Sequence, residues 1–245
     1  TSSLNFRSQG HNLPGGFAQY VLCRADKVYT FPDSISFDHA SLCELIGCAL
    51  NCVDRAELRY GDNVVVIGCG SSGNIIAQLL KNSCAGRVVA LDSVQSKLDR
   101  IAPFGVETVL VDRDDYDKHE RILKEMFPHG IDVIIDAAGD DGPLFERSIK
   151  LLAPKGRYVM YSFFYNEPKT VKVEPALLIK NDLKIVGSPF QMFRFRDCID
   201  VLEQKKIDCS VLISGTYPLD RYFEALDRVI NDNEVMKIII HPNES

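Results

Sequence analysis

Apolar and polar residues alternate in blocks along most of this chain, and the blocks have two characteristic lengths. Short apolar segments are separated by longer stretches in which apolar side chains recur at helical spacing. The short segments predict strands over 63–67, 87–91, 107–111, 132–136, 157–161 and 183–187. The longer stretches predict helices near 72–82, 95–103, 115–127, 142–152 and 174–181. This alternation predicts an α/β fold, in which a doubly wound parallel sheet of six strands is covered by helices on both faces.

The two ends of the chain depart from this alternation. Residues 12–32 alternate apolar and polar side chains as far as a proline, which predicts strands of a small antiparallel region. Residues 38–57 predict a helix that Gly47 interrupts. After residue 188 we expect helices over 197–207 and 219–233 and a last strand over 235–240. The changes of pattern predict three parts, which span residues 1–38, 39–188 and 189–245.

Three glycines lie between the first predicted strand of the alternating region and the helix that follows it. Gly68, Gly70 and Gly73 form the pattern G-x-G-x-x-G, with Ser71 and Ser72 inside it. In such a turn the first glycine permits the sharp bend, the second lets the backbone approach a pyrophosphate, and the third lets the helix pack closely on the strand. The helix N-terminus adds N–H donors and the positive end of its dipole. The sequence therefore predicts a dinucleotide site at this turn.

An acidic residue at the end of the second predicted strand indicates which dinucleotide binds. Asp92 lies 19 residues after Gly73, where a carboxylate can accept hydrogen bonds from the ribose hydroxyls of NAD. The same carboxylate repels the 2′-phosphate of NADP, so we expect NAD to be preferred. We expect Lys97, five residues further on, to add a contact to the ribose or to a phosphate.

Composition and charge argue against several other classes of protein. The chain has 245 residues with 28 basic and 34 acidic side chains, and its net charge of −6 argues against a nucleic-acid partner. No apolar run reaches the roughly 18 residues that a membrane span requires, and the start has no signal-peptide pattern. The eight cysteines contain no C-x-x-C pair, which favours free thiols. We therefore expect a cytoplasmic protein without a membrane partner.

Longer segments resemble one family throughout the chain and in order. They include GGFAQYV, CELIGCALNCVDRAEL, GDNVVVIGCGSSGNIIAQLLK, FGVETVL, GIDVIIDAAG, LLAPKGRYVM, YPLDRYFEALD and MKIIIHP. On these segments the chain resembles the medium-chain dehydrogenase/reductase superfamily, and most closely its zinc-dependent alcohol and sorbitol (polyol) dehydrogenase branch. The resemblance implies a Rossmann sheet of strand order 3-2-1-4-5-6 that binds NAD. It also implies remnants of a GroES-like β catalytic domain at both ends, over residues 1–38 and 189–245.

The resemblance further implies which loops contact the cofactor. These contacts are Ala137, Ala138 and Gly139 beside NAD, Tyr161 and Ser162 near the nicotinamide, and Lys237 near the end of the chain. For Tyr161 and Lys237, simple packing or surface charge is an equal alternative. The partners that the resemblance implies are a small-molecule alcohol or polyol and further copies of the chain in a homo-oligomer.

Zinc chemistry rests on one residue of this chain. In the family that the chain resembles, zinc held by a Cys and a His-Glu pair polarises the alcohol oxygen before hydride leaves. The resemblance places those ligands before Thr1, so we expect zinc in the complete enzyme and its ligands outside this chain. Glu44 matches a Glu that faces the catalytic zinc, where Pro usually follows, but here Leu45 follows. Glu44 is our one candidate for a catalytic residue and for a metal ligand. An equal alternative is that Glu44 only stabilises the start of its helix, where the helix dipole favours an acidic side chain.

Two functions of different classes follow. The first is an NAD-dependent oxidoreductase of a polyol, sugar alcohol or amino alcohol, for which this chain alone is expected to be incomplete. The second is a catalytically incomplete NAD(H)-binding module that acts as a sensor or partner subunit. A zinc-independent quinone reductase would also explain a missing metal, but it does not account for the segment around Glu44.

Overall fold

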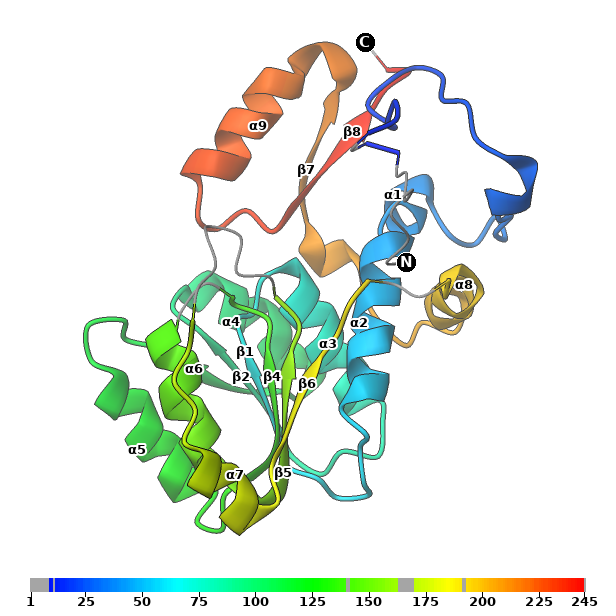
Figure 1. Ribbon diagram of the computed structural model, residues 1–245. Coiled ribbons are helices and arrows are strands. Elements are labelled where there is room, and N and C mark those ends of the chain that lie inside the picture. Colours follow the sequence, from blue (N-terminus) through cyan, green and yellow to red (C-terminus); the bar gives the residue numbers. More distant parts are fainter. Residues whose placement is uncertain (1–8, 11, 140–141, 163–169, 191–192, 245) are drawn as a thin grey trace.

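A parallel sheet of six strands forms the centre of the lower part of the molecule in Figure 1. The computed structural model describes residues 9–10, 12–139, 142–162, 170–190 and 193–244. The strands are β1 (Val64–Ile67), β2 (Val88–Asp92), β3 (Glu107–Leu110), β4 (Ile131–Asp136), β5 (Leu152–Met160) and β6 (Lys184–Gly187). Their order, β3-β2-β1-β4-β5-β6, and their parallel pairing confirm the predicted sheet.

Helices cover both faces of this sheet, because successive side chains of a strand point to opposite sides. All four residues of the central strand β1 are buried. Val64 and Val66 belong to the core on one face, and Val65 and Ile67 to the core on the other. The first face carries α2 (Cys43–Arg55), α3 (Ser71–Lys81), α4 (Gln95–Ile101) and α8 (Phe195–Glu203), and the second carries α5 (Tyr116–Met126), α6 (Gly142–Ser148) and α7 (Pro175–Asn181).

Helix α2 passes through Gly47 without a break, so the predicted interruption is wrong. Gly47 is buried, and α2 packs against both α3 and α8. The buried side of the helix includes Cys43, Ile46, Ala49 and Cys52. Burial of this face outweighs the cost of a glycine inside a helix, which is about 1 kcal/mol relative to alanine. The start of the predicted helix forms a separate short helix, α1 (Phe37–Ala40).

Residues 12–32 form no strand in the part of the chain that the structure describes, so the prediction of antiparallel strands there is wrong. Apart from one isolated bridge at Leu13, the segment holds a turn of 3-10 helix over Ala25–Lys27. Side chains that a sheet would cover are exposed, Tyr20 by 91% and Leu22 by 94%. Alternation alone does not make a strand, because its backbone groups need a partner strand and the described residues provide none.

A second, smaller sheet lies above the first in Figure 1. Strands β7 (Ile213–Pro218) and β8 (Lys237–His241) pair in parallel, and α9 (Tyr222–Asn231) connects them. The last predicted strand is confirmed as β8 and the helix before it as α9. Strand β7 was not predicted, because its glycine and proline are typical of turns. The part boundaries expected at residues 38 and 188 stay predictions.

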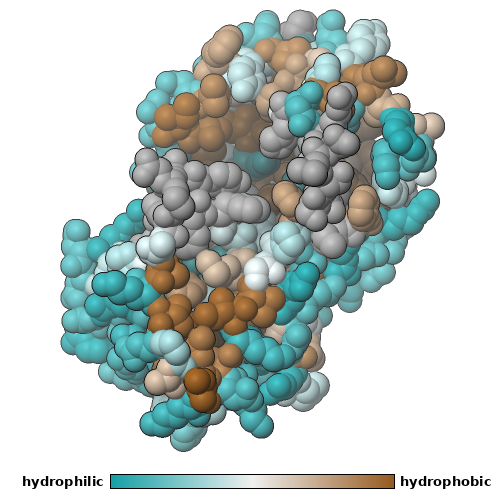
Figure 2. All heavy atoms as spheres, in the orientation of Figure 1, coloured by the Kyte–Doolittle hydropathy of each residue, from teal (hydrophilic) through white to brown (hydrophobic). Residues whose placement is uncertain are grey.

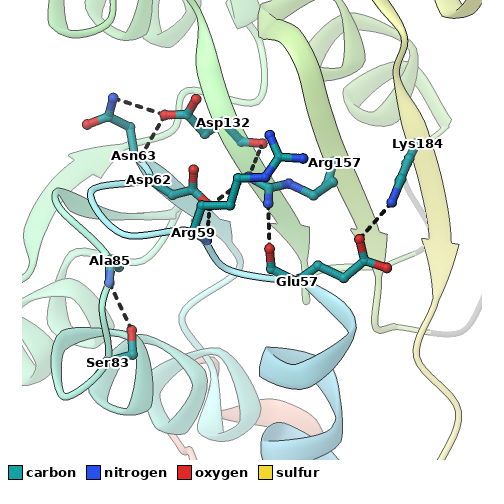
Figure 3. Close-up of polar contacts among 9 residues, drawn as sticks. All are labelled: Glu57, Arg59, Asp62, Asn63, Ser83, Ala85, Asp132, Arg157 and Lys184. Carbon is teal, nitrogen blue, oxygen red and sulfur yellow. Dashed lines mark hydrogen bonds and ion pairs between the residues drawn. The ribbon is translucent and has the colours of Figure 1, made fainter.

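A buried ion pair holds the loop before β1 against the sheet, at the end where the strands begin (Figure 3). Arg157 and Asp62 are 2% and 8% exposed, and Nη2 of Arg157 donates to Oδ2 of Asp62 over 2.7 Å. Nη1 of Arg157 donates to the carbonyl oxygen of Glu57 over 2.6 Å. Asp62 also accepts the backbone N–H of Arg59 over 2.7 Å. Because buried charges are costly without partners, these contacts favour one conformation of the loop.

Apolar side chains also reach the surface. Figure 2 shows a group of them over the lower part of the molecule, where α7 and β6 lie in Figure 1. Ile179 of α7 is 82% exposed and Ile185 of the edge strand β6 is 38% exposed.

Among the described helices, none combines the length and the apolar character needed to cross a membrane.

Candidate functional site

The three glycines after β1 have different surroundings, and each matches one requirement of the predicted turn. Gly68 has a φ of +87°, and a Cβ there would lie 2.7 Å from the backbone nitrogen of Ala138. A Cβ at Gly73 would lie 1.8 Å from the carbonyl oxygen of Gly68. A Cβ at Gly70 would meet nothing within 4 Å. Gly68 and Gly73 therefore permit the close packing of the turn, while Gly70 leaves its outer side open for a ligand.

Helix α3 begins directly after this turn, with Gly70 as its N-cap residue. As a glycine, the N-cap residue has no side chain to accept a hydrogen bond from the first N–H groups of α3, which leaves these donors available to a ligand. The hydroxyl of Ser71 donates to the carbonyl oxygen of Met236 over 2.6 Å. This contact brings the start of β8, with the exposed Lys237, beside the turn. The N–H groups, the helix dipole and this lysine all favour a bound anion.

The carboxylate of Asp92 is held in place by two backbone groups. Its Oδ2 accepts the N–H of Cys69 over 2.7 Å, and its Oδ1 accepts the N–H of Val94 over 2.9 Å. Each oxygen keeps a further lone pair, so the carboxylate can still accept hydrogen bonds from a ribose. Burial, assisted by the charge of Asp92, raises the pKa of Cys69 to about 12, so this residue stays a neutral thiol. Lys97 lies half-buried on α4.

A pocket of about 270 Å³ lies where β1, β2, β3 and β4 end. Its wall includes four predicted residues, Gly68, Asp92, Ala138 and Gly139. It also includes Ser93, Arg113 and Tyr116, which the sequence analysis missed. Tyr161, Ser162, Lys97 and Lys237 lie outside this wall. The pocket combines apolar residues at the strand ends with polar residues around them, which suits a nucleoside.

A further residue that the sequence analysis missed, Asp136, positions the loop after β4. It is 4% exposed, and its Oδ1 accepts the N–H groups of Ala138 over 3.1 Å and Gly139 over 3.2 Å. Its Oδ2 accepts the hydroxyl of Tyr158 over 3.2 Å. The signal in the sequence is an acidic residue that ends an apolar strand directly before a small-residue loop. Asp136 therefore fixes the backbone that lies against Gly68.

Tyr161 lies after β5 and its side chain reaches the start of α3. Its hydroxyl lies close to the side chain of Ser72. The backbone N–H groups of Tyr161 and Ser162 donate to the carbonyl oxygen of Asp136 over 3.0 and 3.1 Å. Burial raises the pKa of Tyr161, and the nearby charge of Glu44 adds to the effect. Tyr161 is therefore protonated at neutral pH, and Glu44 lies within electrostatic range of it.

The described residues alone do not fit a zinc ion. Across 9–10, 12–139, 142–162, 170–190 and 193–244, no three His, Cys, Asp or Glu side chains are grouped as ligands. Glu44 is exposed, and its Oε1 accepts a weak hydrogen bond from the thiol of Cys48 over 3.3 Å. Burial and the charge of Glu44 raise the pKa of Cys48 to about 12, which disfavours the thiolate that a metal needs. The role of Glu44 as a metal ligand stays a prediction.

Comparison with known proteins connects this geometry to one family. A family model described as zinc-binding dehydrogenase matches residues 72–204. D-arabinitol dehydrogenase 1 of Uromyces fabae is 31% identical over 241 residues, which cover 98% of this chain and 68% of that protein. An erythritol/L-threitol dehydrogenase of Mycolicibacterium smegmatis is 28% identical over 233 residues, covering 94% of this chain and 62% of that protein. The chain thus spans roughly two thirds of the length of these relatives.

Solved structures share the fold. A Sinorhizobium meliloti 1021 protein bound to NADP matches with a TM-score of 0.87 and 24% identity, over 98% of this chain and 69% of that one. A short chain alcohol dehydrogenase from Escherichia coli CFT073, complexed with NADH, matches with a TM-score of 0.87 and 20% identity, over 96% of this chain and 68% of that one. The family model covers more than half of the chain, and the relative from Uromyces fabae is 31% identical over nearly all of it. This chain belongs to the zinc-binding dehydrogenases, in the polyol dehydrogenase branch of the medium-chain superfamily.

Proposed function

We propose that the chain binds NAD(H) where its parallel strands end and that it serves an NAD-dependent oxidoreductase of a polyol, sugar alcohol or amino alcohol. The observation that supports this most directly is the contrast within the glycine turn. Gly68 and Gly73 are closed in by backbone atoms, whereas the side of Gly70 that would carry a Cβ is open. That opening lies at the N-terminus of α3, where backbone donors suit a pyrophosphate.

The proposed cofactor contacts divide among four loops, which follow β1, β2, β4 and β5. The N–H groups of Gly70, Ser71, Ser72 and Gly73 would bind the pyrophosphate, with Lys237 adding a charge. Asp92 and Lys97 would contact the adenosine ribose, and Ala137, Ala138 and Gly139 would pass beside the cofactor. Tyr161 and Ser162 would lie near the nicotinamide.

The chain's own residues would bind and orient the reactants. NAD, when bound, supplies the acceptor for the hydride that leaves the carbon of the alcohol. Because burial raises the pKa of Tyr161, its hydroxyl is a hydrogen-bond donor rather than a base. We place Glu44, whose charge reaches Tyr161, at the substrate end of the site.

Three curated relatives support a polyol substrate. Their names are D-arabinitol dehydrogenase 1, erythritol/L-threitol dehydrogenase and, from Halalkalibacterium halodurans, sorbitol dehydrogenase. All three are named as dehydrogenases, so they do not favour the sensor alternative. We also propose a cytoplasmic homo-oligomer. Buried free thiols such as Cys52 and Cys198 suit a reducing compartment, and the exposed Ile179 and Ile185 suit contact with another copy.

A conservative change at Asp92 tests the cofactor site. Asp92→Asn keeps the size of the side chain but removes its charge, so we expect NADH binding to weaken by about 1.5–3 kcal/mol. Asp99→Asn, on the exposed side of α4, should leave NADH affinity unchanged. Calorimetric titration of both variants makes the comparison. Equal NADH affinity in Asp92→Asn and in the unaltered protein would remove Asp92 from the site.

The oxidoreductase function needs a test of turnover. We would fuse the chain behind the region of the Uromyces fabae relative that precedes its matching part, and follow absorbance at 340 nm with NAD and D-arabinitol, erythritol or sorbitol. We expect NADH to form. A folded fusion that binds NADH yet oxidises none of the three polyols would contradict this function and favour the sensor.

A further inference from the structure

Tyr158 places a hydroxyl group inside the apolar core between the sheet and α6. The residue belongs to β5 and is 0% exposed. Its ring contacts that of Phe145 on α6, with 4.7 Å between the ring centroids and 68° between the ring planes. A phenylalanine would fill the same space without a polar atom. A buried hydroxyl is costly unless it is hydrogen-bonded, so the partners of Tyr158 show what its hydroxyl contributes.

The hydroxyl of Tyr158 connects two neighbouring elements. It donates to Oδ2 of Asp136, the last residue of β4, over 3.2 Å. It also lies 3.2 Å from the hydroxyl oxygen of Ser148, the last residue of α6. The hydroxyl of Ser148 itself donates to the carbonyl oxygen of Leu144 over 2.6 Å. The proton of Tyr158 is directed to Asp136, because a carboxylate attracts a donor more strongly than a neutral hydroxyl does.

Asp136 connects this buried contact to the loops where the parallel strands end. Its Oδ1 accepts the N–H groups of Ala138 and Gly139. Its main-chain carbonyl oxygen accepts the N–H groups of Tyr161 and Ser162. Both pairs belong to loops that are proposed to contact the cofactor. The side chain of Asp136 therefore fixes the first loop, and its main chain fixes the second.

The loop after β4 has to be placed accurately, because it lies directly against the glycine turn. A Cβ at Gly68 would lie 2.7 Å from the backbone nitrogen of Ala138. Ala138 and Gly139 also line the pocket. If the carboxylate of Asp136 rotated, both N–H groups would lose their acceptor and the loop would shift relative to the turn. The hydrogen bond from Tyr158 opposes this rotation because it holds Oδ2.

We propose that Tyr158 is a positioning residue of the dinucleotide site, which holds the carboxylate of Asp136 in the orientation that aligns the loop over residues 137–139 with the glycine turn. The proposal rests on the proposed cofactor site and deepens it, because it assigns part of the cofactor affinity to a fully buried side chain. Tyr158 acts through Asp136. Its loss should therefore weaken cofactor binding although every residue that contacts the cofactor remains.

The test compares two variants that each remove one hydroxyl group. Tyr158→Phe removes the donor to Asp136, whereas Ser148→Ala leaves that donor in place. In calorimetric titrations, NADH affinity should fall roughly 5- to 20-fold in Tyr158→Phe and change by less than about 2-fold in Ser148→Ala. In NMR spectra of the protein without cofactor, the amide signals of Ala138 and Gly139 should shift in Tyr158→Phe alone. All titrations are made at a temperature at which circular dichroism shows each variant to be folded.

Changes at Asp136 provide a second test that keeps Tyr158 intact. Asp136→Asn retains an acceptor for the two loop N–H groups, and its amide can donate to the oxygen of Tyr158, whose proton then turns to Ser148. Asp136→Ala provides neither contact. NADH affinity should therefore stay within about 3-fold in Asp136→Asn and fall by at least about 10-fold in Asp136→Ala.

The outcomes separate this proposal from the proposed function. Unchanged NADH affinity in Tyr158→Phe, or an equal loss in Ser148→Ala, would show that Tyr158 only fills the core, and would leave the cofactor site standing. Equal losses in Asp136→Asn and Asp136→Ala would also overturn the positioning role. An unaltered protein that binds no NADH would overturn the proposed function and this proposal with it.

Discussion

Gly70 and Gly73 are three residues apart in one turn, yet an added methyl group would meet different surroundings at each. At Gly73 it would overlap the carbonyl oxygen of Gly68, and at Gly70 it would enter open space. The two glycines therefore serve different purposes: Gly73 permits the turn to pack, and Gly70 keeps the turn accessible. A substitution at each should consequently affect a different property.

Gly73→Ala should destabilise the protein. The methyl group would displace either α3 or the turn at Gly68, and we expect a loss of roughly 1–3 kcal/mol in the free energy of unfolding. Gly70→Ala is the matched control, with the same added group and an expected change within about 0.5 kcal/mol. Urea denaturation followed by circular dichroism measures both. Equal stability of the two variants would contradict the assigned geometry.

Residues of the candidate site could be predicted from the sequence where they belong to a motif that is continuous along the chain. The glycine turn and Asp92 follow from spacing, because a strand, a turn and a helix are continuous in sequence. Arg113 was missed because its place on the pocket wall depends on neighbouring strands, which one strand end does not reveal. Asp136 has a local signal, an acid that ends an apolar strand before a small-residue loop, but the sequence analysis did not use it. Loops from several strands converge where parallel strands end, so the sequence alone reveals only some of the residues that line this site.

At the scale of elements, the sheet and most of the last elements were predictable, and the region before the sheet was not. Buried parallel strands are continuous apolar runs, which is a strong signal, and β1 and β4 show it. The helix α2 and the segment over residues 12–32 gave misleading signals. In α2, tertiary packing outweighs the cost of a glycine. Residues 12–32 alternate apolar and polar side chains, but the described part of the chain offers them no partner strand.

The buried pair of Arg157 and Asp62 should contribute far more to the free energy of unfolding than an exposed pair at the same end of the sheet. Arg157→Met leaves Asp62 buried without its cation, so we expect a loss of roughly 3–5 kcal/mol in unfolding free energy. Lys184→Met breaks the exposed pair with Glu57 and should cost less than about 1 kcal/mol. Urea unfolding of both variants compares them. Similar losses would show that Arg157 contributes through packing rather than charge.

At the scale of the whole molecule, several contacts connect the smaller sheet to the rest of the chain, and two of them lie at the ends of β8. The hydroxyl of Ser71 in α3 donates to the carbonyl oxygen of Met236, just before β8. The second contact involves His241, the last residue of β8. Nε2 of His241 lies 2.7 Å from Oδ1 of Asp38, and Nδ1 lies 2.8 Å from Oε2 of Glu244. Since Asp38 belongs to α1, the contact of His241 with Asp38 joins the last strand to the helix that precedes α2.

The His241 contacts should make stability depend on pH. Hydrogen bonds to Glu244 and then to Asp38 raise the pKa of His241. Because the pKa of His241 is higher in the folded state, protonated His241 stabilises the folded protein fully at pH values below its unfolded pKa of about 6.5. This stabilisation is lost as the pH rises through the pKa of the folded state. The Tm of the protein should therefore exceed that of His241→Gln most near about pH 6, with a difference that shrinks by about pH 9. His129→Gln, at an exposed histidine, is the control, and a difference independent of pH would refute the assignment.

Binding of NAD(H) at the turn over residues 68–73 is open to a paired titration. NADH is titrated by calorimetry into the protein and into Gly70→Val, with the Tm of each recorded. We predict saturable binding of one NADH per chain in the unaltered protein. In Gly70→Val we predict no binding at nearly the same Tm, because the new side chain would occupy the space beside the backbone donors without touching the fold. No saturable binding in the unaltered protein, or equal affinity in Gly70→Val, would contradict the account.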